Sequence, residues 1–314
     1  MERAGYCLKR ILQMIPVLLI VTILIFAMIR MIPGGDTAQV MLGDKATPEA
    51  LAALRSKLGL DQPVTTQYWL FLKGVLKGDF GDSVQYRMPV SALLASRFSV
   101  TLLLTLASAL LTVLISFPLG YLAAVKKDHL ADITIRGYSL LSISLPSFWI
   151  ALLLMLAFGV KLKIFPVSGW GTTWAQHAQS LFLPALTQAV ATSGILIRNL
   201  RNNVIDVKNK DYVDFAKSKG IRPSAVAARH VLRNALIPTT TLLSLKVAGM
   251  LGGSVIIESV FTLPGMGALL VDAVLRRDYA VVQGVVLIFS LTVLIINLLT
   301  DLLYSWLDPR VALN

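Results

Sequence analysis

The stretch "DYVDFAKSKGIRPSAVAARHVLRNALIP", Asp211 to Pro238, is a basic segment with a helical pattern that separates two apolar runs. These runs cover residues 181–200 and 237–257, and each has roughly the 20 residues that a helix needs to cross a bilayer. The stretch is therefore predicted to connect two membrane spans and to face water at one surface of the membrane.

The composition of the whole chain favours an integral membrane protein. Of 314 residues, 56% are apolar and 15% are charged, whereas about 25% of an average soluble domain is charged. The apolar residues are gathered into segments of spanning length at 11–31, 101–125, 137–160, 181–200, 237–257 and 281–306. We expect an all-α protein of six transmembrane helices, in which residues 1–314 form a single transmembrane domain.

Proline occurs inside several of these predicted spans, at Pro16, Pro118, Pro146 and Pro184. Proline breaks a helix in a soluble protein, but neighbouring helices in a membrane bundle can satisfy the carbonyl groups that it frees. The alternative is that a proline marks a hinge.

The distribution of Lys and Arg predicts the orientation of the chain. These residues concentrate at both termini, at 126–136 and above all at 198–236, whereas the other side has Lys161, Lys163, Arg276 and Arg277 in its short loops. Cytoplasmic loops are the basic ones, and long loops translocate largely regardless of charge. Both termini and the 201–236 loop are therefore expected in the cytoplasm, and the 32–100 loop outside.

The net charge of +12 is explained by this topology. We find no RRM, KH, zinc-finger or basic-zipper pattern that would organise the charge for nucleic acid. The lipid bilayer is an expected partner, and nucleic acid is not.

Short helices are predicted in the external segments. In "ATPEALAALRSKLGL", Thr47 is placed as N-cap, Pro48 as the first helical residue and Gly59 just past the end. This helix can lie on the bilayer or pack on the spans. After the fifth span, Pro264 and Gly265 form a turn before a second short helix, which either lines a passage or serves as a packed connector.

Sequence signatures of catalysis are missing from the chain. It contains no G-x-x-x-x-G-K-[ST] sequence, which is the loop that binds nucleotide phosphates. His129, His177 and His230 are far apart, and no ligand spacing links them. We expect no catalytic residue, no metal site and no cofactor in this chain, so if the protein carries out active transport, the energy comes from elsewhere.

Charged residues inside spans are costly, and they usually face a cavity or a partner. Lys246 lies near the middle of the fifth span; it is either a cation that faces a cavity or one half of a structural ion pair. Gly249 and Gly253 lie four residues apart and favour close approach by another helix, within the chain or in a second subunit. These three residues are candidates for a translocation pathway, whereas Glu258 and Arg198 lie at span ends, where we expect them to snorkel.

Within the basic stretch, four neighbouring residues make an apolar patch on one helical turn: Tyr212, Val213, Phe215 and Ala216. Charged residues that include Asp214 surround the patch, Gly220 ends the helix, and Ser224 is placed to cap a second helix. Such a helix can dock into a groove of a partner or rest on anionic headgroups. The residues alone leave both possibilities open.

The spacing of Asp214, Phe215, Ala216 and Gly220 resembles the EAA loop of ABC importer permeases. Ala216 and Gly220 match that motif, whereas Asp214 replaces its Glu and Phe215 its first Ala. The segments that resemble the B-type permease of peptide, opine and nickel importers cover nearly the whole chain in order. They read "LGLDQPVTTQYW", "GDFGDS…MPV…SRFSVTLLLT", "DYVDFAKSKG", "HVLRNALIP", "GGSVIIESVFTLPGMG", "RRDYAVVQG" and "LLTDLLYSWLDPR".

This resemblance implies a subunit of a bacterial inner-membrane importer. Its partners are a homologous second permease, two cytoplasmic ATPases that bind ATP and Mg, and an external solute-binding protein. A coupling helix that includes Tyr212 and the motif residues Asp214 to Gly220 inserts into an ATPase. Lys246 departs from the neutral residue expected in relatives, and it would attract a peptide carboxylate or repel a free cation.

Peptides are the leading substrate class, with di- and oligopeptides as the first expectation. Nickel or a metal chelate is the alternative within the family, and the sequence does not separate these from glutathione or opines. A stand-alone channel or secondary transporter is the alternative from another class, but the spans show no inverted repeat and few ionisable residues for coupling.

Overall fold

The computed structural model describes residues 2–31, 37–43, 46–57 and 59–307. Residues 308–314, which include the C-terminus expected in the cytoplasm, lie outside this range. The described residues are helical with no strand, apart from one isolated bridge between Asp82 and Pro89. The chain divides into two compact units, of which the first holds Arg3–Val100 and Pro264–Leu294, and the second Thr101–Leu263 and Ile295–Asn314.

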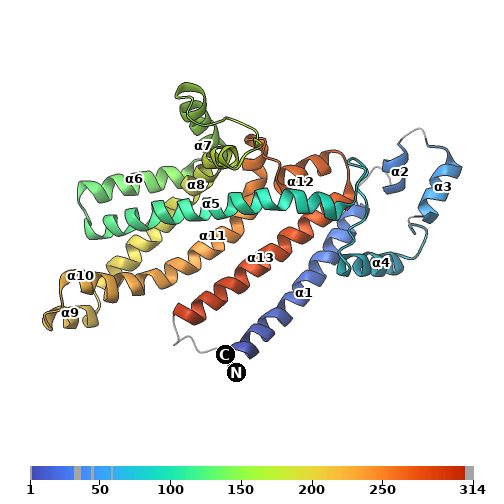
Figure 1. Cartoon of the computed structure of the whole chain (residues 1–314). Coiled ribbons are helices and arrows are strands. Elements are labelled where there is room, and N and C mark those ends of the chain that lie inside the picture. The colour runs from blue at the N-terminus through green and yellow to red at the C-terminus, as the bar shows by residue number, and fades with distance from the viewer. Residues whose placement is uncertain (1, 32–36, 44–45, 58, 308–314) are drawn as a thin grey trace. The chain divides into compact units, whose positions relative to one another are not determined.

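The helices follow one another as labelled in Figure 1. They are α1 (Glu2–Met31), α2 (Thr37–Leu42), α3 (Pro48–Lys57), α4 (Val64–Leu76), α5 (Val90–Val125), α6 (Leu130–Ser144), α7 (Ser147–Leu154), η1 (Met155–Lys161), α8 (Trp174–Lys208), α9 (Asp211–Ser218), α10 (Pro223–Ala225), η2 (Val226–Leu232), α11 (Arg233–Val260), α12 (Met266–Leu275) and α13 (Tyr279–Leu307). The segments η1 and η2 are π-helical.

Five helical stretches among the described residues are long and apolar enough to cross a membrane, and a bent pair would make a sixth span. The pair occupies the segment 137–160, which was expected as one helix. There α6 and the helix formed by α7 and η1 meet at an angle of 111°. The break lies at Leu145, whose backbone is extended, because the ring of Pro146 disfavours helical geometry in the residue before it. The other expected prolines, Pro16, Pro118 and Pro184, lie inside continuous helices.

In the first unit, aromatic and polar contacts join α1 to α4. The Phe26 ring lies 5.2 Å from that of Tyr68 in an edge-on arrangement, and the hydroxyls of Thr22 and Tyr68 are 2.9 Å apart. The expected N-cap of α3 is confirmed, because the amide of Ala50 donates to Thr47 Oγ1. No residue of α3 is fully buried, and Leu51 and Leu54 are half-buried.

Two carboxylates in the first unit hold the segment between α4 and α5. The hydroxyl of Ser83 donates to the buried Asp278 carboxylate at 2.5 Å. The Tyr86 hydroxyl donates to Asp272 at 3.0 Å. Burial, together with this hydrogen bond, raises the pKa of the Tyr86 phenol, so the phenol stays protonated as a donor. The segment is therefore an ordered structure that packs on the α12 region.

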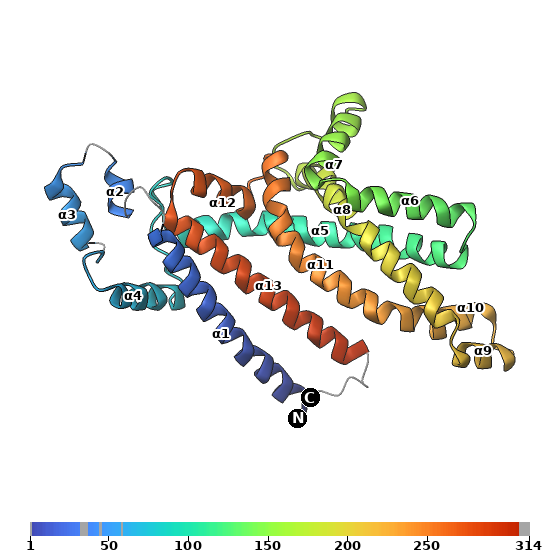
Figure 2. The ribbon, with the colours of Figure 1, turned by 180° about the vertical axis from the view of Figure 1, so that it is seen from behind.

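The second unit is built around α8, which lies between α6 and α11 (Figure 2). A capping box starts α8, because Thr173 accepts from the Gln176 amide and the Gln176 side chain accepts from the Thr173 amide. At Gly194 the backbone of α6 comes so close that an added Cβ would lie 2.6 Å from the Ser139 carbonyl oxygen. Only glycine fits this crossing of α6 and α8.

A buried ion pair fastens one end of α6 to α8. Arg201 on α8 donates to both carboxylate oxygens of Asp132, at 2.6 and 2.7 Å. The Asp132 side chain is completely buried, and it also accepts from the Asp128 amide. Arg136 lies 3.6 Å from the same carboxylate, with half of its side chain exposed. Arg201 therefore provides most of the positive charge that balances the buried Asp132 carboxylate.

Replacing Arg201 with alanine is expected to destabilise the chain by about 3 kcal/mol, because the buried Asp132 carboxylate loses its two short ionic hydrogen bonds and keeps only Arg136 and one backbone amide. Thermal unfolding of the purified chain in detergent measures this effect. The control, Arg136→Ala, removes an exposed partner and should cost less than about 1 kcal/mol. Equal, small effects of both variants would show that the Asp132–Arg201 pair does not hold α6 to α8.

Candidate coupling surface and permeation face

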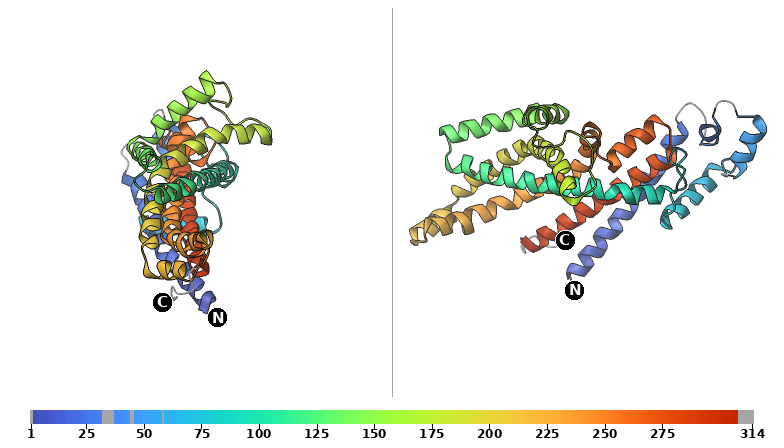
Figure 3. Two further views of the ribbon diagram at one scale, coloured as in Figure 1. Left: turned by 90° about the vertical axis from the view of Figure 1, so that its left-hand side faces the viewer. Right: turned by 45° about the horizontal axis from the view of Figure 1, so that its top comes forward.

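The helix α9 lies next to α10, beyond the C-terminal end of α8 and the N-terminal end of α11 (Figures 1 and 3). Two of its side chains, Val213 and Ala216, are 0% and 4% exposed. They join a buried cluster with Leu200 and Val204 of α8 and Val231 of η2. The spacing of three residues between Val213 and Ala216 puts both on one side of the helix. This side anchors α9 to the second unit.

An adjacent side of α9, about 100° further round the helix, is exposed and carries two aromatic rings. Tyr212 and Phe215 are 44% and 61% exposed. The ammonium group of Lys219 lies 4.5 Å above the Phe215 ring, and the Asp214 carboxylate pairs with Lys217 at 2.8 Å. The result is an aromatic surface bordered by charge, with Phe215 at its most exposed point.

The structure divides the expected patch of four apolar residues into two faces. The rings of Tyr212 and Phe215 are exposed, although the Tyr212 hydroxyl accepts a hydrogen bond from Asn234, whereas Val213 and Ala216 are covered by the chain itself. The pattern of the sequence placed all four on one helical turn, but it could not show that half of them pack inward. We call the exposed residues Tyr212, Asp214 and Phe215 the coupling face.

Gly220 ends α9 with a backbone conformation that favours glycine. Its φ is +73°, in the left-handed region where a Cβ is strained. The Gly220 amide donates to the Lys217 carbonyl, and the Ile221 amide donates to that of Ala216. These two bonds form a Schellman cap. The prediction that Gly220 ends the helix is confirmed.

The second helix of the loop begins earlier than expected. Its N-cap position is Arg222 and its first residue is Pro223, so the prediction of Ser224 as the cap was wrong. Proline suits the first position because its missing N–H has no partner there in any case. The helix continues through η2 into α11 and links the coupling loop directly to the long helix that carries Lys246.

The three pathway candidates lie on the side of α11 that is open in this chain. A Cβ added at Gly249 or Gly253 would meet no atom within 4 Å, and the same holds for Gly252. Both predicted glycines are exposed, and Lys246 is half-buried one turn away. Among the described residues, the side chain of Lys246 has neither an ion pair nor a hydrogen bond. The glycine face is therefore not filled by another helix of the described chain.

Glu258, in the last turn of α11, was expected to snorkel at a span end, and that prediction was wrong. Its side chain is fully buried, and it accepts a hydrogen bond of 2.7 Å from the Thr101 hydroxyl. Burying a carboxylate is costly unless it is hydrogen-bonded. The sequence signal that could have located this site is the polar series that begins at Thr101 on the facing α5.

Comparison with known proteins identifies the family of this chain. Residues 116–313 match the family of binding-protein-dependent transport system inner membrane components, and residues 4–105 match the N-terminal model of the same systems. The first match spans well over half of the chain. The chain belongs to this family. It is thus the permease subunit of an ABC importer, a family in which ATP hydrolysis takes place in separate subunits.

Curated relatives of this permease extend over its whole length. The glutathione transport system permease protein GsiC of Salmonella typhimurium is 41% identical over 307 residues, which cover 98% of each chain. GsiC of Escherichia coli strain K12 is 39% identical over the same length. The prediction that this chain belongs to the peptide, opine and nickel importer family is therefore confirmed.

Solved structures show the same fold in more distant permeases. An inward-facing MetNI methionine ABC transporter has a TM-score of 0.57 at 15% identity, and covers 69% of this chain and 96% of its own. An amino acid ABC transporter crystallised with histidines gives 0.53 at 15% identity, with 69% and 94% covered. At this identity the likeness concerns the fold, and it leaves the substrate of this permease open.

Proposed function

We propose that this permease imports small peptides, including glutathione-like peptides, as one half of a two-permease pathway. A homologous second permease supplies the other half. Two ATPases bind ATP and Mg on the cytoplasmic side, and an external solute-binding protein delivers the peptide. The family membership supports the assembly, and the name of the GsiC relatives supports the substrate class.

The observation that carries the coupling role is the two-sided construction of α9. The inward side, with Val213 and Ala216, fixes the helix to α8 and η2. The outward side presents Tyr212 and Phe215 to solvent. Exposed aromatic rings within a charged rim are typical of surfaces that anchor in a protein pocket. A push from an ATPase on this face would reach α11 through η2, because α9 packs against η2 and η2 is continuous with α11.

The proposed orientation follows from charge. The loop 201–236 carries the largest group of Lys and Arg among the predicted loops, which favours the cytoplasmic side. Both termini are then cytoplasmic, the 32–100 segment is external, and the spans are assigned to the six predicted segments. The location is the bacterial inner membrane, as in the family.

Lys246 and the open glycine face of α11 are proposed to line the pathway. The glycines at 249 and 253 leave room beside the helix, and Lys246 lacks a carboxylate partner among the described residues. A cation in such a position can attract the carboxylate of a passing peptide. It would disfavour free metal cations, so this arrangement favours peptides over nickel.

Substitution of Lys246 by glutamine is expected to reduce the preference for peptides with free carboxylates. Hydrogen bonds to charged groups contribute about 1.5–3 kcal/mol, so we expect the ratio of uptake of a free-acid peptide to its amide to fall roughly tenfold. Uptake into proteoliposomes of the assembled importer, with the same solute-binding protein throughout, measures the ratio. Lys246→Arg keeps the charge and should keep the preference. An unchanged ratio in Lys246→Gln removes Lys246 from the pathway.

Uptake of labelled glutathione and dipeptides in proteoliposomes tests the proposed function as a whole. We expect accumulation only when both permeases, the ATPases, the binding protein and ATP are present. ATP-independent uptake by this permease alone would contradict it. Accumulation of nickel rather than peptide by the complete assembly would reject the substrate class and leave the coupling role intact.

A further inference from the structure

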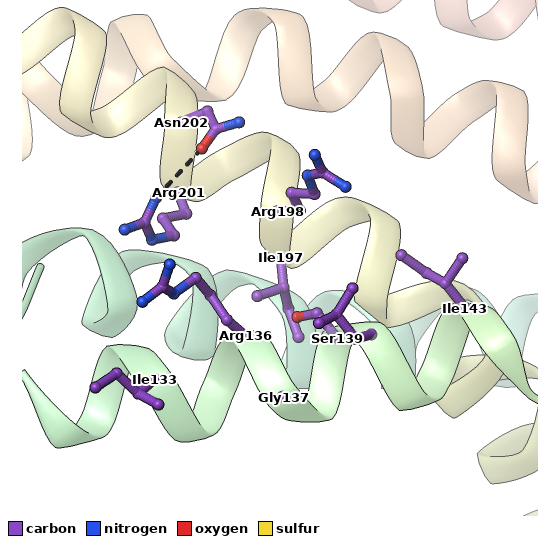
Figure 4. Close-up of a pocket in the computed structure, with 10 residues that line it drawn as sticks. Ile133, Arg136, Gly137, Ser139, Ile143, Ile197, Arg198, Arg201 and Asn202 are labelled. Atoms are coloured by element: carbon purple, nitrogen blue, oxygen red, sulfur yellow. Dashed lines mark hydrogen bonds between the residues drawn. The ribbon is translucent and has the colours of Figure 1, made fainter. Parts of the chain in front are cut away.

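A pocket of about 590 Å³ lies between α6 and α8, apart from the coupling face and the glycine face. Figure 4 shows Arg136 from α6 and Arg201 from α8 at one end of it, and Ile143 toward the other end. Arg198 lies between them on α8, and Leu140 completes the apolar wall. The lining therefore has a basic region at Arg136, Arg198 and Arg201, with Ile133 beyond it, and an apolar wall toward Ile143.

The separation of the basic region from the apolar wall follows from the way the helices run. Arg201 meets Asp132 near the start of α6, while Ser142 near its end donates to the Val190 carbonyl, so α6 and α8 are antiparallel. Arg136 and Ile143 are seven residues apart on α6, which corresponds to about 10 Å along the axis. This separation of Arg136 and Ile143 is similar to that between the headgroup of a phospholipid and the first carbons of its acyl chains.

The basic region carries an excess of positive charge. Three guanidinium groups line it, and Asp132 provides one carboxylate, to which Arg201 is fully committed. Arg136 reaches that carboxylate only at 3.6 Å. Arg198 is exposed, and its side chain makes no ion pair or hydrogen bond within the part of the chain that the structure describes. The three guanidinium groups outnumber the nearby carboxylates of Asp132 and Asp128, so an excess of positive charge remains.

Gly137 lines the pocket, and its lack of a side chain leaves space there. A Cβ at Gly137 would meet no atom within 4 Å. Leu140 and Ile143 are 61% and 44% exposed, so they offer apolar surface at the outside of the helix pair. This apolar surface lies next to the guanidinium group of Arg198, an arrangement that suits a lipid with an anionic headgroup.

We propose that this pocket binds an anionic phospholipid, with the phosphodiester at Arg198 and Arg136 and the start of an acyl chain on Leu140 and Ile143. Guanidinium groups match phosphate oxygens in geometry and charge. Basic pockets between transmembrane helices are sites for anionic headgroups. The proposal goes beyond the import function and is independent of the substrate and of the ATPases. The bound lipid would bridge the two helices that the Asp132–Arg201 pair already joins.

Native mass spectrometry of the purified full-length permease, with added phosphatidylglycerol or phosphatidylcholine, tests the proposal. We expect retention of phosphatidylglycerol and a higher thermal unfolding temperature with this lipid, because a ligand of the folded state stabilises it. Arg198→Gln should weaken binding about fivefold, since a basic residue near an anionic surface contributes about 1 kcal/mol. Lys127→Gln removes an exposed charge from the loop before α6 and should leave binding unchanged.

A second variant fills the pocket without changing its charge. Gly137→Leu places a side chain in the hollow and should abolish retention, whereas Thr134→Leu adds the same side chain at an exposed position outside the lining and should not. Equal retention of both lipids, or unchanged phosphatidylglycerol binding in Arg198→Gln and Gly137→Leu, overturns the proposal. Loss of association with the second permease in these variants, with lipid binding intact, would identify the pocket as a protein interface and reject it too.

Discussion

Replacing Phe215 with alanine is expected to uncouple the importer while α9 stays folded. Phe215 is the most exposed aromatic ring on the coupling face and makes no contribution to the buried cluster beneath α9. Truncating an aromatic anchor at the centre of an interface typically costs 2 kcal/mol or more, which corresponds to an approximately 30-fold weaker association. We expect peptide uptake and stimulated ATP hydrolysis in proteoliposomes to fall by about this factor, along with co-purification of the ATPases.

The matched control for this variant is Leu130→Ala. Leu130 is an apolar residue that is 78% exposed at the start of α6, on the same proposed side of the membrane but outside the coupling face. This control should retain wild-type uptake. Normal coupling in Phe215→Ala would show that the ATPase docks elsewhere.

Replacing Ala216 with glutamate is expected to destroy coupling by a different route. Ala216 is buried among side chains of α8 and η2, so a carboxylate there would lose hydration without gaining a partner. That penalty is about several kcal/mol, enough to release a helix of eight residues from its site by local unfolding. We expect uptake to fall to background, and trypsin to cleave the loop at Lys217 and Lys219 many times faster than in the wild type.

Ala228→Glu provides the comparison, because it introduces the same carboxylate at an exposed alanine of the same loop. Its loop should resist trypsin as the wild type does. The Phe215→Ala variant should also resist trypsin, so the two losses of coupling are separable. Slow cleavage of Ala216→Glu would mean that Ala216 does not anchor α9.

The sequence predicted the elements of the fold better than their packing. Hydropathy located the apolar segments, and local signals located helix ends such as the Thr47 cap and the stop at Gly220. These features are encoded within a few neighbouring residues. The break at Leu145 was more difficult, because a proline inside a membrane helix either stays in line, as at Pro184, or turns the chain, as at Pro146.

Long-range contacts account for what the sequence could not predict at the candidate sites. Helical spacing alone does not say which side of α9 packs inward, so Ala216 could not be distinguished from Phe215. Glu258 looked like an end residue because its partner, Thr101, lies 157 residues away in the chain. The pocket beside Arg198 depends on the crossing of α6 and α8, whose close approach at Gly194 has no sequence motif of its own.

Site-specific cross-linking at position 215 tests the central claim, that α9 transmits the work of an ATPase to this permease. The chain has one cysteine, so a Cys7→Ser background with Phe215→Cys carries a single reactive thiol. In the assembled importer we predict that a thiol-reactive photo-cross-linker joins this position to an ATPase subunit, and that Leu130→Cys in the same background does not. Absence of an ATPase adduct at position 215 in an importer that transports peptide would contradict the coupling role.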